Sequence, residues 1–428
     1  MTDIYHKEIG YYHEEIGCYD VAIIGAGPAG IMAGISAKSK SNKVVILEKN
    51  STPGKKLLIS GKGRCNVTTA KDIEDIVKAF GPNGKFLYSA LGQFSNQDVI
   101  NFFESRGVKL KRERGERIFP VSDSSATILN CLITELKNNN VEVKYNYDVK
   151  NISREGGNFC LSSKQEKILS ENLIISTGGK SYPETGSTGD GYVFAKTLGH
   201  TVITAIPALV PLIVRNRNLN QLAGLSLKNV ELNLISNSEV FAHEFGEMLF
   251  THVGISGPIV LKMSKKVYIE LTGGNRVTAY IDLKPKLNEA TLRQRIITET
   301  ALTPKKEYQS LLSTLLPKSL IPYAINETGI DRHQQSSTLN KQQIASLIKF
   351  LKYFEFKIDG VEPINNAIVT HGGISTDEID RKTMESKIIP GLFFAGEIIC
   401  LDGPTGGFNM QKAFSTGFVA GNSAKAKI

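Results

Sequence analysis

Short apolar runs that end in glycine-rich turns recur along this chain of 428 residues. The first run, residues 20–24 (DVAII), leads directly into the turn GAGPAG at residues 25–30, after which IMAGISAKSK has a helical composition. A second apolar run, residues 43–47 (KVVIL), ends at Glu48. This pattern predicts a strand, a glycine turn, a helix and a second strand in that order.

The spacing within the turn is typical of a dinucleotide-binding unit. Gly25 would permit the tight turn, Gly27 would let the backbone approach a pyrophosphate, and Gly30 would let helix and strand pack closely. The helix N-terminus would offer unpaired amides to the phosphates. Glu48 stands where an acidic residue receives the ribose hydroxyls, and its charge would repel a 2′-phosphate. The unit is therefore expected to hold FAD or NAD, not NADP.

Later segments repeat the pattern of an apolar run that ends in glycine. Residues 172–180 (NLIISTGGK) form one such run, and residues 388–397 (IIPGLFFAGE) form another that ends in Gly396 and Glu397. A further glycine-rich turn at residues 402–411 (DGPTGGFNMQ) precedes a helix rich in small residues. Each segment alone could be an ordinary loop, but together they indicate that distant parts of the chain build one site.

Composition describes a globular protein of two or three domains, with 41% hydrophobic and 22% charged residues. The longest apolar stretch, residues 21–37, is interrupted by glycines and a proline, so we expect no membrane span. The first residues lack the apolar core of a signal peptide. The five cysteines form no C-x-x-C pair, which argues against a disulfide framework or a metal site and favours the cytoplasm.

The net charge of +9 makes anionic ligands plausible. The densest basic stretch, residues 109–117, is interleaved with Glu113 and Glu116 and carries no ladder of aromatic residues. We therefore expect a small-molecule substrate and do not expect nucleic acid as a partner. The oligomeric state is left open.

Seven ordered motifs carry a resemblance to a known family. They are DVAIIGAGPAG with Glu48, LLISGKGRCNVT (57–68), ERIFPVS (116–122), STGGKSYPETGSTGDGY (176–192), EMLFTHVGISGP (247–258), THGGIS (370–375) and GLFFAGEIICLDGPTGGFNMQKAFSTGFVAG (391–421). With these motifs the chain resembles the BaiN-like, or YhiN-like, FAD-dependent oxidoreductases. They are related to aminoacetone oxidase and belong to the wider glutathione-reductase-type flavoproteins.

The resemblance implies an α/β fold in which a discontinuous Rossmann-like FAD-binding domain is interrupted by an inserted domain. The FAD domain would comprise residues 1–204 and 364–428, and the insert, residues 205–363, would be β-barrel-like and helical. The local sequence agrees, because residues 228–234 have strand composition whereas residues 288–301 and 342–353 are amphipathic at helical spacing.

The resemblance also assigns residues to the cofactor. The three glycines of the first turn would contact the pyrophosphate, Glu48 the adenosine ribose and the backbone of Val149 the adenine, while the last glycine turn would surround the flavin ring. The full set is Gly25, Gly27, Ala29, Gly30, Glu48, Lys49, Lys56, Gly61, Arg64, Cys65, Asn66, Val149, Thr177, Gly178, Gly179, Gly396, Glu397, Gly406, Gly407, Asn409, Met410 and Gln411.

Four further side chains have a functional and a structural interpretation. Cys65, with no neighbouring cysteine, is either a flavin-side residue or a small packing residue, and disulfide-reductase chemistry is not expected. His252 could donate a catalytic proton or could be a structural turn histidine. His371 is expected to be a loop residue. Arg117 could hold an anionic substrate or could be an exposed surface arginine.

The expected activity is transfer of hydride from NAD(P)H through FAD to an activated carbon–carbon double bond of a small molecule. Because only one nucleotide fingerprint is present and FAD would occupy it, NADH or NADPH would dock transiently. The chain departs from the family in having no tryptophan and in placing Lys412-Ala413-Phe414 where bulkier aromatic residues are expected. An oxidase of a small amine such as aminoacetone, a tRNA-associated flavoprotein and a flavin sensor therefore stay open.

Overall fold

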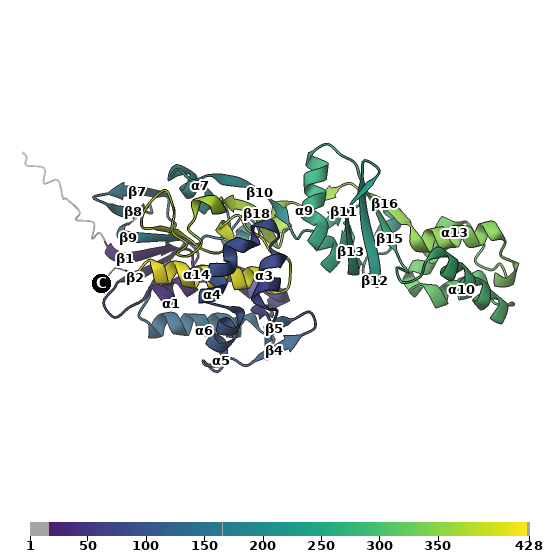
Figure 1. Ribbon diagram of the computed structural model, residues 1–428, viewed down its shortest axis with the longest axis horizontal. Coiled ribbons are helices and arrows are strands. Elements are labelled where there is room, and N and C mark those ends of the chain that lie inside the picture. The colour runs from purple at the N-terminus through teal and green to yellow at the C-terminus, as the bar shows by residue number, and fades with distance from the viewer. Residues whose placement is uncertain (1–16, 165, 426–428) are drawn as a thin grey trace, which may run out of the picture. The chain divides into compact units, whose positions relative to one another are not determined.

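The computed structural model describes residues 17–164 and 166–425 (Figure 1). The chain divides into two compact units: unit 1 contains the described residues up to Ala205 and from Gly372 onward, and unit 2 is Ile206–His371. Strands β10 (Val202–Ala208) and β18 (Val369–Ile374), which carry the chain across this division, pair as a two-stranded sheet.

Residues 364–371 lie in unit 2, whereas the expected C-terminal part of the FAD domain began at residue 364. The reason is local pairing of the backbone. The amide of Glu362 donates to the carbonyl of Pro211 (3.0 Å) and that of Ile368 to the carbonyl of Leu209 (3.2 Å). The returning chain therefore stays with unit 2 beyond residue 364.

Unit 1 is built on a mostly parallel sheet with the order β6-β2-β1-β9-β8-β7, in which β19 also pairs with β9. Strands β6, β2, β1, β9 and β19 run parallel, and β8 and β7 are antiparallel additions. Their bounds are β1 (Gly17–Ile24), β2 (Val44–Glu48), β6 (Glu142–Tyr145), β7 (Asn151–Glu155), β8 (Asn158–Ser162), β9 (Lys167–Ile175) and β19 (Leu392–Phe394). The carboxyl ends of the parallel strands lie at one edge, where α/β sheets bind ligands.

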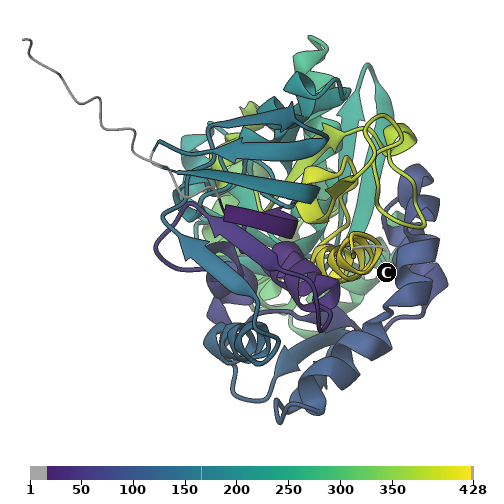
Figure 2. The same ribbon diagram turned by 90° about the vertical axis from the view of Figure 1, so that its left-hand side faces the viewer.

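Two helices of unit 1, α1 (Pro28–Ala37) and α14 (Phe408–Ser423), pack against each other through small residues (Figure 2). A Cβ at Gly417 would lie 2.3 Å from the carbonyl oxygen of Ala29, and one at Gly421 would lie 2.1 Å from that of Ala33. The contacts advance together along both helices, so the helices are parallel, and their backbones approach too closely for any larger residue.

Unit 1 also contains a three-stranded sheet in the order β3-β5-β4 and further helices. These elements are α2 (Lys55–Ile59), β3 (Thr68–Thr69), α3 (Ile73–Ala79), α4 (Tyr88–Gln93), α5 (Asn96–Glu104), β4 (Leu110–Glu113), β5 (Arg117–Pro120), α6 (Ser125–Asn138) and α7 (Asp190–Thr197).

Unit 2 contains an antiparallel sheet with the strand order β16-β15-β12-β13-β14-β11-β17. Its strands are β11 (Leu212–Ile213), β12 (Ser226–Ser236), β13 (Glu239–Phe250), β14 (Gly254–Ser256), β15 (Val277–Asp282), β16 (Phe354–Ile358) and β17 (Gly360–Val361). The two end strands of this order, β16 and β17, are separated in sequence only by Asp359. The sheet must therefore curl until its two edges meet.

The helices of unit 2 are α8 (Arg217–Asn220), α9 (Pro258–Thr272), α10 (Glu289–Leu302), α11 (Tyr308–Leu315), α12 (Ile321–Thr328) and α13 (Lys341–Lys352). The amphipathic segments expected at residues 288–301 and 342–353 are thus α10 and α13. Each unit has its own hydrophobic core. The predicted α/β class, with a Rossmann-like sheet and an additional antiparallel sheet, is confirmed. Within the described ranges, no helix combines the length and apolarity needed to cross a membrane.

Candidate functional site

The glycine turn after β1 contains glycines of two kinds. A Cβ at Gly25 (φ 99°) would lie 2.9 Å from the carbonyl oxygen of Ser176, and a Cβ at Gly30 would lie 1.9 Å from that of Gly25. At Gly27, by contrast, a Cβ would meet no atom of the described residues within 4 Å. Packing therefore requires Gly25 and Gly30, whereas Gly27 borders open space at the start of α1, as the approach of a pyrophosphate would need.

Glu48, at the end of β2, is buried and stabilises this turn through hydrogen bonds. One carboxylate oxygen accepts from the Ala26 amide (2.8 Å), and the other accepts from the backbone and side-chain amides of Asn50 (2.8 and 2.7 Å). Each carboxylate oxygen has further lone-pair directions. The geometry is therefore compatible with the expected contact to ribose hydroxyls.

The turn after β19 meets the same region of unit 1. Gly396 has φ 81°, and a Cβ on it would lie 2.7 Å from the Cβ of Ala29. Its amide donates to the hydroxyl of Thr416 on α14 (2.9 Å). Segments distant in sequence, namely the first glycine turn, the turn after β19 and α14, are thus brought together.

Polar side chains link the same region to other segments. Lys56 donates to Glu397 and to Ser181 (2.7 Å each), which joins the segment after β2 to those after β9 and β19. Lys49 donates to Thr188 and Asp190 (2.6 Å each). Both lysines were expected near the cofactor, and in the structure both are engaged with neighbouring side chains.

Two buried hydroxyls lie close to this region without a hydrogen-bond partner in the described part of the chain, those of Thr177 and Tyr192. Leaving such a group unsatisfied costs about 1–3 kcal/mol, so each is a candidate for a ligand contact. Thr177 belongs to the expected set, as do its neighbours Gly178 and the buried Gly179. Tyr192 was missed, although it ends one of the motifs that carry the family resemblance. Burial raises its pKa, so the phenol is neutral.

The loop at residues 61–66 has an unusual backbone. Gly61, Lys62, Gly63 and Cys65 all have positive φ angles, between 58° and 82°. For Lys62 and Cys65 this left-handed conformation is strained, and such strain concentrates at functional sites. The loop is predicted to lie beside the flavin ring, and its strained backbone makes it a candidate functional segment.

Arg64 extends from this loop to strands β4 and β5. Its guanidinium pairs with Glu113 and Asp123, and it lies 4.2 Å from the ring centre of Phe119. Arg64 was expected on the cofactor side, but its charge is already balanced by these two carboxylates. Sequence analysis identified neither of them as its partner.

Cys65 is fully buried, and burial raises the pKa of its thiol to about 12. Because only the thiolate reacts with alkylating reagents, iodoacetamide at pH 8 should leave Cys65 intact in the native protein while it modifies the exposed Cys18. Peptide mass mapping after brief labelling tests this, with denatured protein as the control. Rapid modification of native Cys65 would contradict it and would indicate an accessible thiolate.

The start of α14 is the second notable helix N-terminus. Its N-cap residue Gly407 has φ 96° and, in the described structure, provides no side-chain cap. When the Asn66 amide takes the orientation that satisfies its neighbours, its side-chain oxygen accepts from the Gly407 amide (2.9 Å) and its amide group donates to the carbonyls of Thr68 and Ile118. Asn66, expected beside the cofactor, therefore orients this helix start.

The side chains of the first α14 turn are used within the protein. Asn409 accepts from the amide of Gly403 (2.9 Å) and donates to its carbonyl (2.7 Å). Gln411 is fully buried and accepts from Thr68 (2.5 Å) while it donates to Ser415 (2.9 Å). Gly406 (φ 122°) has no side chain, and Met410 is partly buried. The polar groups that this turn can offer a ligand are therefore its backbone amides.

The N-termini of α1 and α14 lie at different positions along the direction that the two parallel helices share. Because Gly417 contacts Ala29 and the helices are parallel, α14 begins eight residues before α1 along their shared direction, or about 12 Å at a rise of 1.5 Å per residue. An elongated ligand with a pyrophosphate at one end and a polarised ring at the other fits this offset. FAD is such a molecule and, when bound, would supply hydride transfer. The amides at the start of α14 would stabilise negative charge on its ring.

Lys412 is a buried cation in the second turn of α14. Its ammonium donates to the carbonyl of Leu401. Burial lowers its pKa to about 8, against the opposing effect of Glu397 and Asp402. The sequence marked this position as a departure from the family but did not predict that the charge would be buried.

The remaining candidates are distributed over the two units. Val149 is buried between β6 and β7 of unit 1. Arg117 is exposed, and its guanidinium donates to the carbonyl of Arg114 (2.9 Å). In unit 2, His252 lies on an exposed turn between β13 and β14, and His371 lies 3.4 Å from the Lys265 ammonium.

Comparison with known proteins agrees with this geometry. Residues 19–423 match the family described as "HI0933-like protein Rossmann domain". The chain is 32% identical over 94% of its length to the 3-dehydro-bile acid delta(4,6)-reductase of Clostridium scindens, 98% of which is covered. It is 31% identical over 92% of its length to the ribosomal RNA dihydrouridine synthase of Haemophilus influenzae, with 96% of that protein covered.

Two solved structures share the fold of this chain. A flavocytochrome c3 fumarate reductase superposes with a TM-score of 0.51 at 17% identity, over 95% of this chain and 78% of that chain. The 3-ketosteroid-delta4-(5alpha)-dehydrogenase of Rhodococcus jostii RHA1 also gives a TM-score of 0.51, at 15% identity over 97% and 99% of the two chains. The chain therefore belongs to the HI0933-like Rossmann family, the BaiN-like flavoproteins, and is an FAD-dependent oxidoreductase.

Proposed function

We propose that this protein uses NADH or NADPH to reduce a carbon–carbon double bond conjugated with a carbonyl group, with FAD as the hydride carrier. The observation that carries the proposal is the identity of the relatives. A bile acid delta(4,6)-reductase and a dihydrouridine synthase, both matched over more than nine-tenths of the chain, differ in substrate but share this type of bond. A small-molecule enone is the substrate class that we favour.

The geometry of unit 1 supports the cofactor part of the proposal. The open space at Gly27, the unpartnered hydroxyl of Thr177 and the uncapped start of α14 would serve the pyrophosphate, a polar group and the ring of FAD. The side chains of Glu48, Lys49 and Lys56 are engaged in internal hydrogen bonds. The protein would thus position FAD mainly through its backbone.

Anaerobic absorption spectroscopy tests the reaction in two steps. Adding NADH, and separately NADPH, to the flavin-loaded protein should bleach the visible flavin bands. A steroid or bile acid with a 3-oxo-Δ4 group should then restore them and gain two hydrogen atoms by mass. If neither nucleotide bleaches the flavin, the reductase proposal fails. Peroxide release with a small amine as the only reductant would instead identify an oxidase.

His252 is the proposed proton donor for the carbon that does not receive hydride. Replacing it with alanine should lower kcat by about 100-fold, the usual contribution of general acid catalysis. Flavin content and bleaching by nucleotide should not change. His243, which is exposed on β13 of the same unit, provides the matched control. Equal activity of the His252→Ala and His243→Ala variants would remove His252 from the mechanism.

A second candidate substrate is uridine within RNA. Two relatives are ribosomal RNA dihydrouridine synthases, from Haemophilus influenzae and Escherichia coli, at 31% and 30% identity. The net charge of +9 also favours contact with a polyanion. Sequence analysis did not expect a nucleic-acid partner, so this candidate rests on the relatives.

Reduction of RNA can be measured directly. Unmodified ribosomal RNA is incubated with the flavin-loaded protein and the effective nucleotide, digested to nucleosides and analysed for dihydrouridine by mass spectrometry. Formation of dihydrouridine at one position would establish RNA as the substrate. Its absence, together with turnover of the steroid enone, would support the small-molecule proposal.

A further inference from the structure

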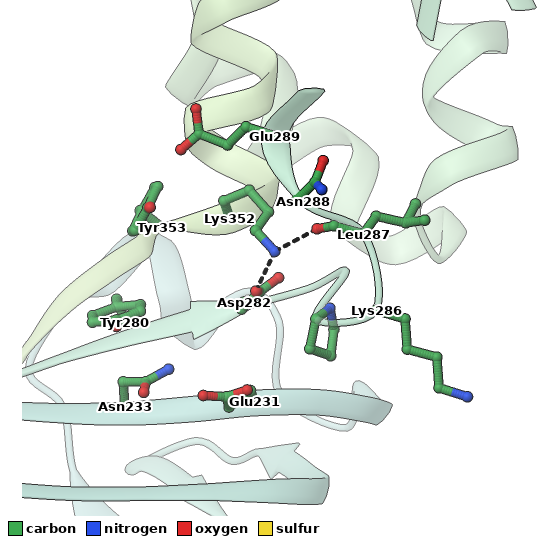
Figure 3. Close-up of a pocket in the computed structure, with 11 residues that line it drawn as sticks. Glu231, Asn233, Tyr280, Asp282, Lys286, Leu287, Asn288, Glu289, Lys352 and Tyr353 are labelled. Atoms are coloured by element: carbon green, nitrogen blue, oxygen red, sulfur yellow. Dashed lines mark hydrogen bonds and ion pairs between the residues drawn. The ribbon is translucent and has the colours of Figure 1, made fainter. Parts of the chain in front are cut away.

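Unit 2 contains a cavity of about 560 Å³ that none of the roles above uses (Figure 3). It lies between one face of the sheet, at β12 and β15, and the segments at the start of α10 and the end of α13. Glu231 and Asn233 on β12 are paired in register with Asp282 and Tyr280 on β15. These four side chains therefore share one face of the sheet.

Asn233 is the polar group in the cavity that most needs a partner. The residue has a relative exposure of 6%, and its side chain makes no hydrogen bond to another of the described residues. The carbonyl oxygen and amide group of Asn233 are thus available to a molecule inside the cavity.

The charges of the cavity favour a cation. Lys352 donates to Asp282 (2.5 Å) and to the carbonyls of Leu287 (2.7 Å) and Lys284 (3.2 Å), which occupies all three of its ammonium hydrogens. In Figure 3 the Lys286 side chain extends away from the other lining residues. Lys352 therefore has no ammonium hydrogen left for an anion. Glu231 has no cationic partner among the described residues.

Two tyrosines also line the cavity. The rings of Tyr280 and Tyr353 have centres 5.6 Å apart, with an interplanar angle of 49°. Burial and the nearby carboxylate of Glu231 raise the pKa of Tyr280, and burial and Glu289 raise that of Tyr353. Both phenols are neutral at physiological pH. Aromatic faces beside carboxylates are the combination that attracts organic cations.

We propose that this cavity is a binding site for a small organic cation with a primary ammonium or guanidinium group. Glu231 would balance its charge, the faces of Tyr280 and Tyr353 would contact it, and Asn233 would accept a hydrogen bond from it. The site lies wholly within unit 2 and does not depend on the proposed reaction.

Isothermal titration calorimetry of the full-length flavoprotein with agmatine and with spermidine tests the site. Saturable binding of at least one amine is expected, and 1,4-butanediol and glutarate, as neutral and anionic probes, should not bind. Glu231→Gln and Asn233→Ala should each weaken amine binding about tenfold, because each removes one specific contact. Thermal melting of both variants verifies that they are folded.

Glu239→Gln is the matched control, since Glu239 is an exposed glutamate of the same sheet outside the cavity lining. It removes the same charge and should leave amine binding unchanged. Binding of neither amine, or equal weakening by Glu231→Gln and Glu239→Gln, would overturn the proposal. Preferential binding of glutarate would overturn it as well.

Discussion

Replacing Gly30 with alanine is expected to lower the free energy of unfolding by about 3 kcal/mol or more. The new methyl group would overlap backbone atoms, which cannot move aside without shifting a whole element. The new Cβ would lie 1.9 Å from the carbonyl oxygen of Gly25 and 2.6 Å from the hydroxyl of Ser176. Helix α1 would have to move away from β1, and its N-terminus would move with it. Urea unfolding and the flavin content of the purified variant measure the two effects.

Gly27→Ala is the matched comparison, because it makes the same chemical change three residues earlier. Gly27 has an ordinary φ of −81°, and its Cβ would face open space. Stability of the flavin-free protein should change by less than about 1 kcal/mol, the scale of an N-cap substitution. Affinity for FAD should fall at least tenfold if the pyrophosphate approaches here. A stable Gly30→Ala variant, or unchanged FAD affinity in Gly27→Ala, would contradict this account of the turn.

The elements around this turn could be predicted because their signals are local. A β-branched run followed by closely spaced glycines determines a strand, a turn and a helix within about fifteen residues. The same holds for α10 and α13, whose apolar spacing lies within each segment. The family motifs predicted the order of the two FAD-domain segments and the insert along the chain. The structure shows in addition that Gly396 and Gly417 both contact Ala29.

Hydrogen-bond partners could not be predicted in the same way. Glu48 accepts from Ala26, and Gln411 accepts from Thr68, which lies 343 positions earlier in the chain. Whether such a side chain faces a ligand or supports the protein depends on packing between distant segments. For Gln411 and Asn409 the sequence predicted a position beside the flavin ring, and the structure shows that their side chains have internal partners.

The cavity in unit 2 illustrates the same difficulty. Its lining comes from β12, β15, the segment before α10 and the end of α13, and none of these segments carries a recognisable motif. Asn233 lies among alternating strand residues, where an asparagine has no distinctive pattern. Only its burial without a partner reveals that it is unusual, and burial is a property of the folded chain.

Lys412 should give the protein an unusual dependence of stability on pH. Its pKa falls from 10.5 to about 8 in the folded state because of burial, so between these values the unfolded chain binds more protons than the folded one. The free energy of unfolding therefore rises with pH in this window. The expected gain from Lys412 alone is about 3 kcal/mol between pH 8 and pH 10.5. Below pH 8 the lysine is protonated in both states and contributes no slope.

Lys412→Met isolates this contribution, because methionine fills a similar volume without titrating. Urea unfolding of both proteins at several pH values between 7 and 11 gives the difference in stability, from which the titration of all other groups largely cancels. Relative to the variant, the natural protein should gain stability from pH 8 to pH 10.5. A difference that is flat across this window would show that Lys412 keeps an ordinary pKa, and a difference of opposite sign would mean that Glu397 and Asp402 outweigh the effect of burial.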